Sequence, residues 1–214
     1  MQRATCHSLR SGSQPVTEDD PEPALPPPRR ARRVWVVGAC GSGKTTVARH
    51  IGGSLGIASA HVDDYIWLPG WKLRERSEML SMVEERLSGE EWVMEGNLGR
   101  DAVRLWAIAD RADLIVWLDL PLRVTFWRLV RRCLRRAVFK TECCNGNRET
   151  LRQSFFSSES ILLYAWSTRH KRRVIYGHML RNRPHVRLRS PQEVRGWLEA
   201  FDIPTPVVPQ APGA

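Results

Sequence analysis

Residues 33–46 read Arg33-Val-Trp-Val-Val-Gly38-Ala-Cys-Gly-Ser-Gly-Lys-Thr-Thr46, a mostly apolar run followed by a glycine-rich segment. The residues before the first glycine are β-branched or aromatic, which predicts a buried strand over 33–37. Helical periodicity begins at Lys44 and continues to Leu55. A Gly-x4-Gly-Lys-Thr pattern between a strand and a helix is the Walker A arrangement. The sequence therefore predicts a loop that binds phosphate groups.

The chemistry of this loop depends on its backbone and on two side chains. Glycines let backbone N–H groups curl around phosphate oxygens, and the helix N-terminus adds partial positive charge. Lys44 would reach the β- and γ-phosphates, and the Thr45 hydroxyl would ligate Mg²⁺. We therefore expect the chain to bind ATP or GTP with Mg²⁺. The expected binding residues are Gly38, Ala39, Cys40, Gly41, Ser42, Gly43, Lys44, Thr45 and Thr46.

The remaining pattern alternates strands and helices. Further strands are predicted over 58–63, 91–95, 113–119 and 185–189, and helices over 75–87, 102–109, 122–136, 149–181 and 190–201. Alternation at these lengths requires a parallel sheet with helices on both faces. We expect a three-layer α/β/α domain over residues 33–203, with a helical lid at about 128–150. In such sheets ligands bind at the carboxyl ends of the strands.

Both ends of the chain differ in composition from this domain. Residues 1–32 and 204–214 are rich in proline and poor in large apolar residues, so we expect a disordered arm and a disordered tail. No apolar run predicts a signal peptide or a membrane anchor. The five cysteines lack a paired spacing and are expected to be reduced thiols. Together these features indicate a cytoplasmic protein that does not enter a membrane.

Three acidic residues follow predicted strands at the edge where the ligand is expected. Asp63 ends the second strand and could accept a proton from an acceptor hydroxyl or hold Mg²⁺ through water. Glu95 follows the third strand beside the phosphate-binding loop, where an acid would hold the Mg²⁺ water shell. Asp119 has similar geometry but precedes Leu120-Pro121, so we favour a helix cap there.

The net charge of +10 is concentrated in the second half of the chain. Residues 123–196 carry 18 Lys or Arg against four acids, which indicates an anionic partner. Arg128, Arg132 and Arg135 (or Arg136) share one face of a predicted helix. Arginines on a closing lid can stabilise charge on a transferring phosphoryl group. The alternative is a solvated basic face, and we expect one or two of these arginines to be catalytic.

Taken together, the motifs resemble the adenylate-kinase-like branch of P-loop kinases. They are most similar to the bacterial kinases labelled "DNA topology modulation protein"-like. The resemblance covers about residues 33–200 and is carried by these stretches: Gly38–Thr46, His61-Val-Asp63, Trp67-x2-Gly-Trp71, Trp92-Val-Met-Glu95-Gly-Asn97, Leu118-Asp-Leu-Pro121, the arginine helix and Leu188-Arg-Ser-Pro191.

This resemblance implies a five-stranded sheet in the order 2-3-1-4-5, use of ATP and Mg²⁺, and a mobile lid. It also implies adenine contacts near Arg189 and Ser190. True adenylate kinases carry Asp-Gly-Phe-Pro-Arg where this chain has Glu95-Gly-Asn-Leu-Gly, so the acceptor stays open.

Two hypotheses of function follow. The first is an ATP-dependent kinase that transfers the γ-phosphoryl group to a nucleotide or another small molecule. The second is a nucleic-acid-associated ATP-binding protein that holds DNA or RNA with its basic C-terminal half. No recognition-helix, RRM or zinc-finger pattern supports the second. We therefore favour the kinase.

Overall fold

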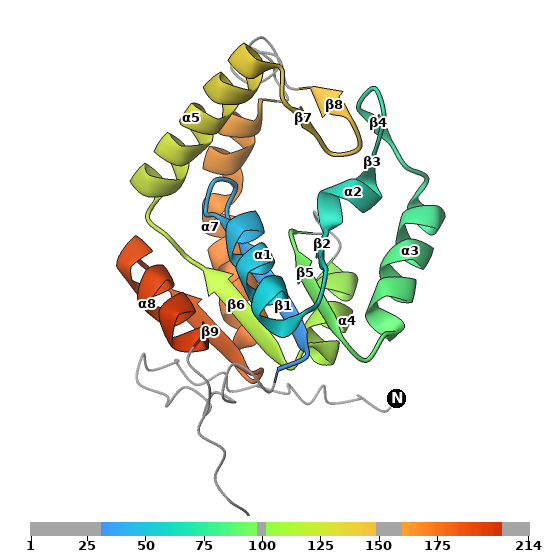
Figure 1. Ribbon diagram of the computed structural model, residues 1–214, viewed down its shortest axis with the longest axis vertical. Coiled ribbons are helices and arrows are strands. Elements are labelled where there is room, and N and C mark those ends of the chain that lie inside the picture. The colour runs from blue at the N-terminus through green and yellow to red at the C-terminus, as the bar shows by residue number, and fades with distance from the viewer. Residues whose placement is uncertain (1–30, 98–101, 149–159, 203–214) are drawn as a thin grey trace, which may run out of the picture.

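A five-stranded parallel sheet forms the centre of the protein (Figure 1). A computed structural model describes residues 31–97, 102–148 and 160–202. The strands are β1 (Arg33–Gly38), β2 (Ser59–His61), β5 (Trp92–Glu95), β6 (Leu114–Leu118) and β9 (His185–Leu188). Their order across the sheet is β2-β5-β1-β6-β9. Counted over these five strands, this is the predicted order 2-3-1-4-5, and the predicted fold class is confirmed.

Helices cover both faces of the sheet (Figure 1). On one face α1 (Lys44–Leu55) and α8 (Pro191–Asp202) pack against Val34 and Val36 of β1. On the other, α3 (Arg76–Ser88), α4 (Ala102–Arg111) and α7 (Ile161–Leu180) cover Trp35 and Val37. Successive strand residues point to opposite faces. The fully buried β1 run therefore supplies both cores and leaves Gly38 at its carboxyl end.

Two small hairpins and two helices lie beyond the carboxyl edge of the sheet (Figure 1). They are α2 (Val62–Ile66), the hairpin β3 (Trp67–Leu68) and β4 (Lys72–Leu73), α5 (Leu122–Phe139), and the hairpin β7 (Glu142–Cys143) and β8 (Asn147–Arg148). The sequence pattern predicted α5 but neither hairpin, because two-residue strands are too short to show alternation. Within the described residues no helix is long and apolar enough to cross a bilayer.

Several sequence-based boundaries differ from the structure. The second strand ends at His61, and Asp63 instead lies in the first turn of α2. The proposed cap by Asp119 is wrong, because Pro121 occupies the N-cap position of α5 and Asp119 pairs with arginines. Ser190 does cap α8, accepting from the Glu193 N–H at 3.1 Å. Residues 1–30 of the predicted arm (1–32), the whole predicted tail (204–214) and residues 149–159 of the long predicted helix lie outside the described residues. Ala31, which was assigned to the arm, is buried in the core beside β1, so the domain begins earlier than predicted.

Asp113 fixes the start of β1, the strand that leads to the Gly-rich loop. Its carboxylate accepts hydrogen bonds from the backbone N–H groups of Arg32 and Arg33 at 3.0 and 2.9 Å. The Arg33 guanidinium donates to the same carboxylate at 3.0 and 2.6 Å. Burial alone raises the pKa of Asp113, but these donors outweigh burial and the net pKa is lowered. Asp113 thus stabilises the fold in its charged form.

Replacing Asp113 by Asn should destabilise the protein by about 1 kcal/mol at pH 7, because a charge-assisted but half-exposed cluster is lost. A group with a lowered folded pKa contributes stability above its unfolded pKa and loses it as the pH falls through the folded pKa. Urea denaturation should therefore show a difference from wild type at pH 7 that shrinks at pH 3. Glu91→Gln, which removes an exposed pair with Arg32, is the control and should have little effect. Equal stability of both variants at pH 7 would contradict this role of Asp113.

Candidate active site

The Gly-rich loop, here called the P-loop (Gly38–Thr45), turns the chain from β1 into α1. Gly41 and Gly43 have φ angles of +79° and +96°, a region in which L side chains are strained. A Cβ on Gly41 would also lie 2.3 Å from the Thr125 carbonyl oxygen on α5. These positions need glycine for conformation and, at Gly41, for space. The loop leaves α1, a helix of 12 residues, with its N-terminus facing the site.

Lys44 and Thr45 stand at the start of α1 with partners that suit their predicted roles. The Lys44 ammonium donates to the Ala39 carbonyl oxygen at 3.0 Å. The Thr45 hydroxyl donates to Glu95 Oε1 at 2.7 Å. The same Glu95 oxygen lies 2.5 Å from His61 Nδ1. Three elements, α1, β5 and β2, thus bring a hydroxyl, a carboxylate and an imidazole together.

Glu95 is held in its charged form although it is buried. Burial raises its pKa, but the hydrogen bond with His61, the charge of Lys44 and the hydrogen bond from Thr45 lower it, and the net pKa lies below its ordinary value. The hydrogen bond with Glu95 raises the pKa of His61. The sequence motifs did not link His61 to Glu95. The pairing of β2 with β5 places these two residues opposite each other.

Thr45 and Glu95 offer the oxygen atoms that Mg²⁺ prefers, 2.7 Å apart at the mouth of the P-loop. The described residues contain no cluster of three or more His, Cys, Asp or Glu that could hold a metal. A site with few protein ligands suits Mg²⁺ that is bound largely through phosphates and water. These two residues therefore fit a nucleotide-bound Mg²⁺.

Asp63 faces the same region from α2. Its side chain has exposed surface, yet burial among surrounding protein atoms is the largest cause of its raised pKa. Lys44 and Arg132 lower that pKa and Glu95 raises it, which places all three charges around Asp63. Its exposed surface leaves the carboxylate accessible to a ligand. A raised pKa makes Asp63 a stronger base than an ordinary carboxylate.

The arginines of α5 have different surroundings. Arg128 Nη1 lies 3.5 Å from the Ser42 carbonyl oxygen, beside the P-loop. Arg132 is half-buried, and its charge lowers the pKa of Asp63. Arg136 lies close enough to Cys144, in the turn between β7 and β8, for its charge to affect that thiol. Arg135 is exposed and has no contact within the described residues that ties it to the P-loop. The structure thus brings Arg128 and Arg132 to the site and leaves Arg135 outside it.

Asn97 lies beside the P-loop, although the sequence motifs assigned no role to it. Its side-chain amide donates to the Gly38 carbonyl oxygen at 3.0 Å and accepts from the Tyr176 hydroxyl at 2.5 Å. The Trp35 indole donates to the Gly96 carbonyl oxygen at 3.2 Å. Hydrogen bonds therefore hold the residues that follow β5 against the P-loop and α7. Tyr176 could not be linked to this edge from the sequence, because it lies 79 residues from Asn97.

Side-chain hydrogen bonds join the β7–β8 hairpin to the β3–β4 hairpin. Asn147 accepts from the Trp71 N–H at 2.7 Å and donates to the Leu68 carbonyl oxygen at 3.0 Å. Asn145 donates to the carbonyl oxygens of Asp64 and Trp67 at 2.6 and 2.7 Å. The Trp67–Trp71 stretch, one of those that carry the family resemblance, provides most of the partners in these contacts. The hairpin lies over α2, which carries Asp63.

The adenine contacts implied by the family resemblance concern Arg189 and Ser190. Arg189 is exposed just after β9, and its N–H donates to Glu193 at 2.8 Å. Ser190 is occupied as the cap of α8. Their role in base binding stays a prediction.

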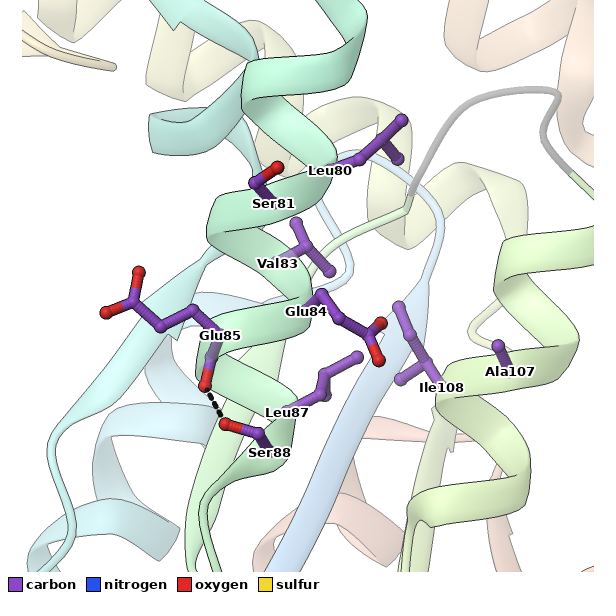
Figure 2. A pocket seen from close by; sticks show the side chains of 9 residues that line it. All are labelled: Leu80, Ser81, Val83, Glu84, Glu85, Leu87, Ser88, Ala107 and Ile108. Atoms are coloured by element: carbon purple, nitrogen blue, oxygen red, sulfur yellow. Dashed lines mark hydrogen bonds between the residues drawn. The ribbon is translucent and has the colours of Figure 1, made fainter.

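The molecule has one cavity lined by α7 and another lined by α3. One, of about 380 Å³, adjoins the P-loop at Ala39 and is lined by α7. The other, of about 550 Å³, lies between α3 and α4 and is mainly apolar (Figure 2). Its lining includes no residue of the P-loop, α2 or α5. Of the P-loop residues, Ala39 lines the first cavity, and neither Lys44 nor Asp63 is among the lining residues of either cavity.

No family model and no curated protein matches the sequence. The structure is similar to a shikimate kinase from Bacteroides thetaiotaomicron, with a TM-score of 0.51 and 16% identity over 79% of this chain and 95% of that chain. It is also similar to a shikimate kinase from Acinetobacter baumannii in complex with shikimate, with a TM-score of 0.50 and 17% identity over 80% and 90% of the two chains. At these identities the likeness shows the fold alone. The finer resemblance to one bacterial branch stays a prediction.

Lys44→Ala should abolish tight binding of Mg²⁺–ATP while the protein stays folded, because Lys44 acts as a positioned charge on the phosphates. We expect ATP affinity, measured by calorimetry, to fall at least 100-fold with an unchanged circular dichroism spectrum. Lys72→Ala changes an exposed lysine in β4 and serves as the control. Unchanged ATP affinity in folded Lys44→Ala protein would contradict the role given to the P-loop.

Proposed function

We propose that the protein is a kinase that transfers the γ-phosphoryl group of Mg²⁺–ATP to a small-molecule or nucleotide acceptor. One observation carries this proposal: Lys44, Thr45, Glu95, Asp63 and Arg132 converge beside one P-loop, although they come from four different elements. Phosphoryl transfer requires such positioning together with positive charge around the transferred group. The kinase fold of the similar structures is consistent with this function.

In the proposed reaction, an acceptor oxygen forms a bond to the γ-phosphorus, and the bond from that phosphorus to the β–γ bridging oxygen breaks. ADP then leaves, and Asp63 takes the proton of an acceptor hydroxyl. The raised pKa of Asp63 favours this role, because proton transfer to a stronger base is more favourable. Lys44 and Arg132 supply positive charge near the transferred phosphoryl group.

Mg²⁺ bound to the phosphates would neutralise charge that develops on their oxygens. Within the chain, Thr45 and Glu95 would hold this ion, Thr45 directly and Glu95 through its hydration shell. His61 keeps the Glu95 carboxylate oriented and charged. Support for this assignment comes from the 2.7 Å contact between Thr45 and Glu95.

Exclusion of water is the proposed task of the β7–β8 hairpin. A kinase must keep water from attacking the γ-phosphate, and closing segments commonly do this. The four hydrogen bonds that Asn145 and Asn147 form with residues 64–71 hold this hairpin over α2. We assign residues 128–148 to the lid on this ground.

A transfer screen tests the proposed function. The wild-type protein is incubated with γ-labelled ATP, Mg²⁺ and a panel of nucleosides, nucleotides, sugars and hydroxy acids, and label in the products is measured. We expect label on at least one acceptor, absent from Lys44→Ala protein. Transfer to no member of the panel, by folded protein that binds ATP, would count against a kinase.

Asp63→Asn should lower kcat by roughly 10²- to 10⁴-fold and leave ATP affinity within about threefold, because a general base acts mainly in the transition state. Steady-state kinetics and ATP titration separate the two quantities. Asp64→Asn, at the adjacent position in α2, is the control. If Asp63→Asn loses ATP affinity as much as kcat, Asp63 is a nucleotide or metal residue instead.

Alanine substitutions in α5 should have unequal effects. Arg132→Ala should lower kcat/KM by about 10³-fold, the loss typical of an arginine that stabilises transferring phosphate. Arg135→Ala should stay within about twofold of wild type, since Arg135 is exposed and away from the P-loop. Duplex-DNA binding of the same variants is measured over a salt series. Equal losses of DNA affinity, each lowering the salt slope by about one, with unchanged turnover would favour the nucleic-acid hypothesis.

A further inference from the structure

The β7–β8 hairpin carries two adjacent cysteines, Cys143 at the end of β7 and Cys144 in the turn that follows. Both are reduced and half-buried. Their side chains form a hydrogen bond with each other, which places the two sulfur atoms side by side. The proposed kinase reaction uses neither thiol, and the part of the chain that the structure describes offers no third ligand that would make them a metal site. Adjacent thiols can be joined by oxidation.

The backbone of the turn is strained at the second cysteine. Cys144, Asn145 and Gly146 have φ angles of +43°, +61° and +79°, so three residues in succession are left-handed. Glycine adopts this region freely and asparagine tolerates it, whereas the Cβ of a cysteine crowds the backbone there. Strained residues persist only where their surroundings hold them, and they gather at segments that switch conformation.

Hydrogen bonds to α2 and to the β3–β4 hairpin hold this turn in place (Figure 1). Asn145 and Asn147 make four such bonds to residues 64–71. Asn147 also donates to the Cys144 carbonyl oxygen at 2.6 Å. The same asparagine therefore binds both the strained cysteine and the neighbouring hairpin. A change in the backbone at Cys144 would act directly on the contacts that hold the hairpin over α2.

A disulfide between the two cysteines does not fit the present backbone. Neighbouring Cα atoms lie about 3.8 Å apart across a trans peptide bond, which is less than the roughly 4.4 Å at which ordinary disulfides begin. Joining the sulfur atoms therefore requires new backbone angles at Cys143 or Cys144. Because Cys143 pairs with Asn147 in the hairpin, such a change also moves Asn147. A strained disulfide is readily reduced again, as a reversible modification requires.

We propose that Cys143 and Cys144 form a reversible disulfide with each other, and that this modification releases the β7–β8 hairpin from α2. The oxidant is a low-molecular-weight disulfide, which the two thiols reduce by exchange. The modification itself does not depend on the proposed kinase function. Its consequence for activity rests on that function, because the hairpin is there assigned the exclusion of water.

The exchange takes place in two steps. In the first, the Cys143 thiolate attacks a sulfur atom of the oxidant, the S–S bond of the oxidant breaks, and one small thiolate leaves. In the second, the Cys144 thiolate attacks the Cys143 sulfur, the mixed disulfide breaks, and the other small thiolate leaves. The oxidant gains two electrons from the cysteine pair, and the two thiol protons end on the released thiols.

The surroundings of the pair set the order of these steps. The hydrogen bond with Cys143, burial and the charge of Asp63 raise the pKa of Cys144 and outweigh the opposing charge of Arg136. A thiol with a raised pKa is a slow nucleophile, so Cys143 attacks first. The largest of these causes disappears once Cys143 is bound in the mixed disulfide, which frees Cys144 to complete the bond.

Mass spectrometry tests the modification. The full chain is equilibrated with an excess of glutathione disulfide, alkylated and digested with trypsin, which cuts after Lys140 and Arg148 and releases both cysteines in one peptide, 141–148. We expect this peptide to lack two hydrogen atoms and to resist alkylation until dithiothreitol is added. Alkylated thiols in this peptide, a lasting glutathione adduct, or a bond to any other cysteine would overturn the proposal.

Exchange of the Trp71 amide hydrogen, followed by NMR, tests the release of the hairpin. This N–H donates to Asn147 Oδ1 at 2.7 Å in the reduced protein. We expect exchange roughly tenfold faster after oxidation, as in reduced Asn147→Ala protein, which lacks the acceptor. In the Cys143→Ser, Cys144→Ser double variant, glutathione disulfide should leave this rate unchanged. Equal exchange in oxidised and reduced wild-type protein, or an equal response of the double variant, would overturn the proposal.

Activity separates this inference from the proposed function. With an acceptor found in the transfer screen, oxidation should lower transfer by wild-type protein roughly tenfold, and dithiothreitol should restore it. The ratio of oxidised to reduced activity should stay near one in the double variant. Equal transfer before and after complete disulfide formation would overturn the control of the lid. Protein that forms the disulfide and releases the Trp71 amide but transfers phosphate to no acceptor retains the oxidation site and loses the kinase assignment.

Discussion

The left-handed backbone turn between β1 and α1 is the constraint on which the site depends. Gly41 and Gly43 adopt positive φ angles there, and a side chain at Gly41 would collide with the Thr125 carbonyl oxygen at 2.3 Å. The turn therefore lets α1 begin directly after β1 and lets α5 pack against the loop. Because α5 lies this close, Arg128 contacts the Ser42 carbonyl oxygen of the loop, and the charge of Arg132 lowers the pKa of Asp63.

The parallel sheet brings the acidic and basic groups to this turn. Pairing of β5 with both β1 and β2 sets Glu95 between Thr45 and His61. On the other side of β1, β6 ends at Leu118, and the next residue, Asp119, pairs with Arg173 of α7 and Arg187 of β9. One carboxylate thus lies among Thr45, His61 and the P-loop, and the other joins α7 to β9.

The sequence predicted the strands, the helices and the P-loop through strong periodicity and one specific motif, whereas the order of the strands was implied by the family resemblance. It predicted Thr45 and Glu95 as neighbours, since the carboxyl ends of parallel strands meet at one edge. It did not predict the partners of His61, Asn97 or Asp119, which depend on strand pairing and on α7 packing. Both hairpins were missed because their strands have two residues each.

A crystal structure of the protein with Mg²⁺ and a non-hydrolysable ATP analogue tests the central claim most directly. We expect a β-phosphate inside the P-loop, and the Lys44 ammonium moved from the Ala39 carbonyl oxygen to the phosphates. We expect Mg²⁺ bound to the Thr45 hydroxyl. Glu95 should lie in the hydration shell of the ion, and the γ-phosphate should face Asp63 and Arg132. A nucleotide bound away from the P-loop, or a γ-phosphate far from Asp63 and Arg132, would contradict the account.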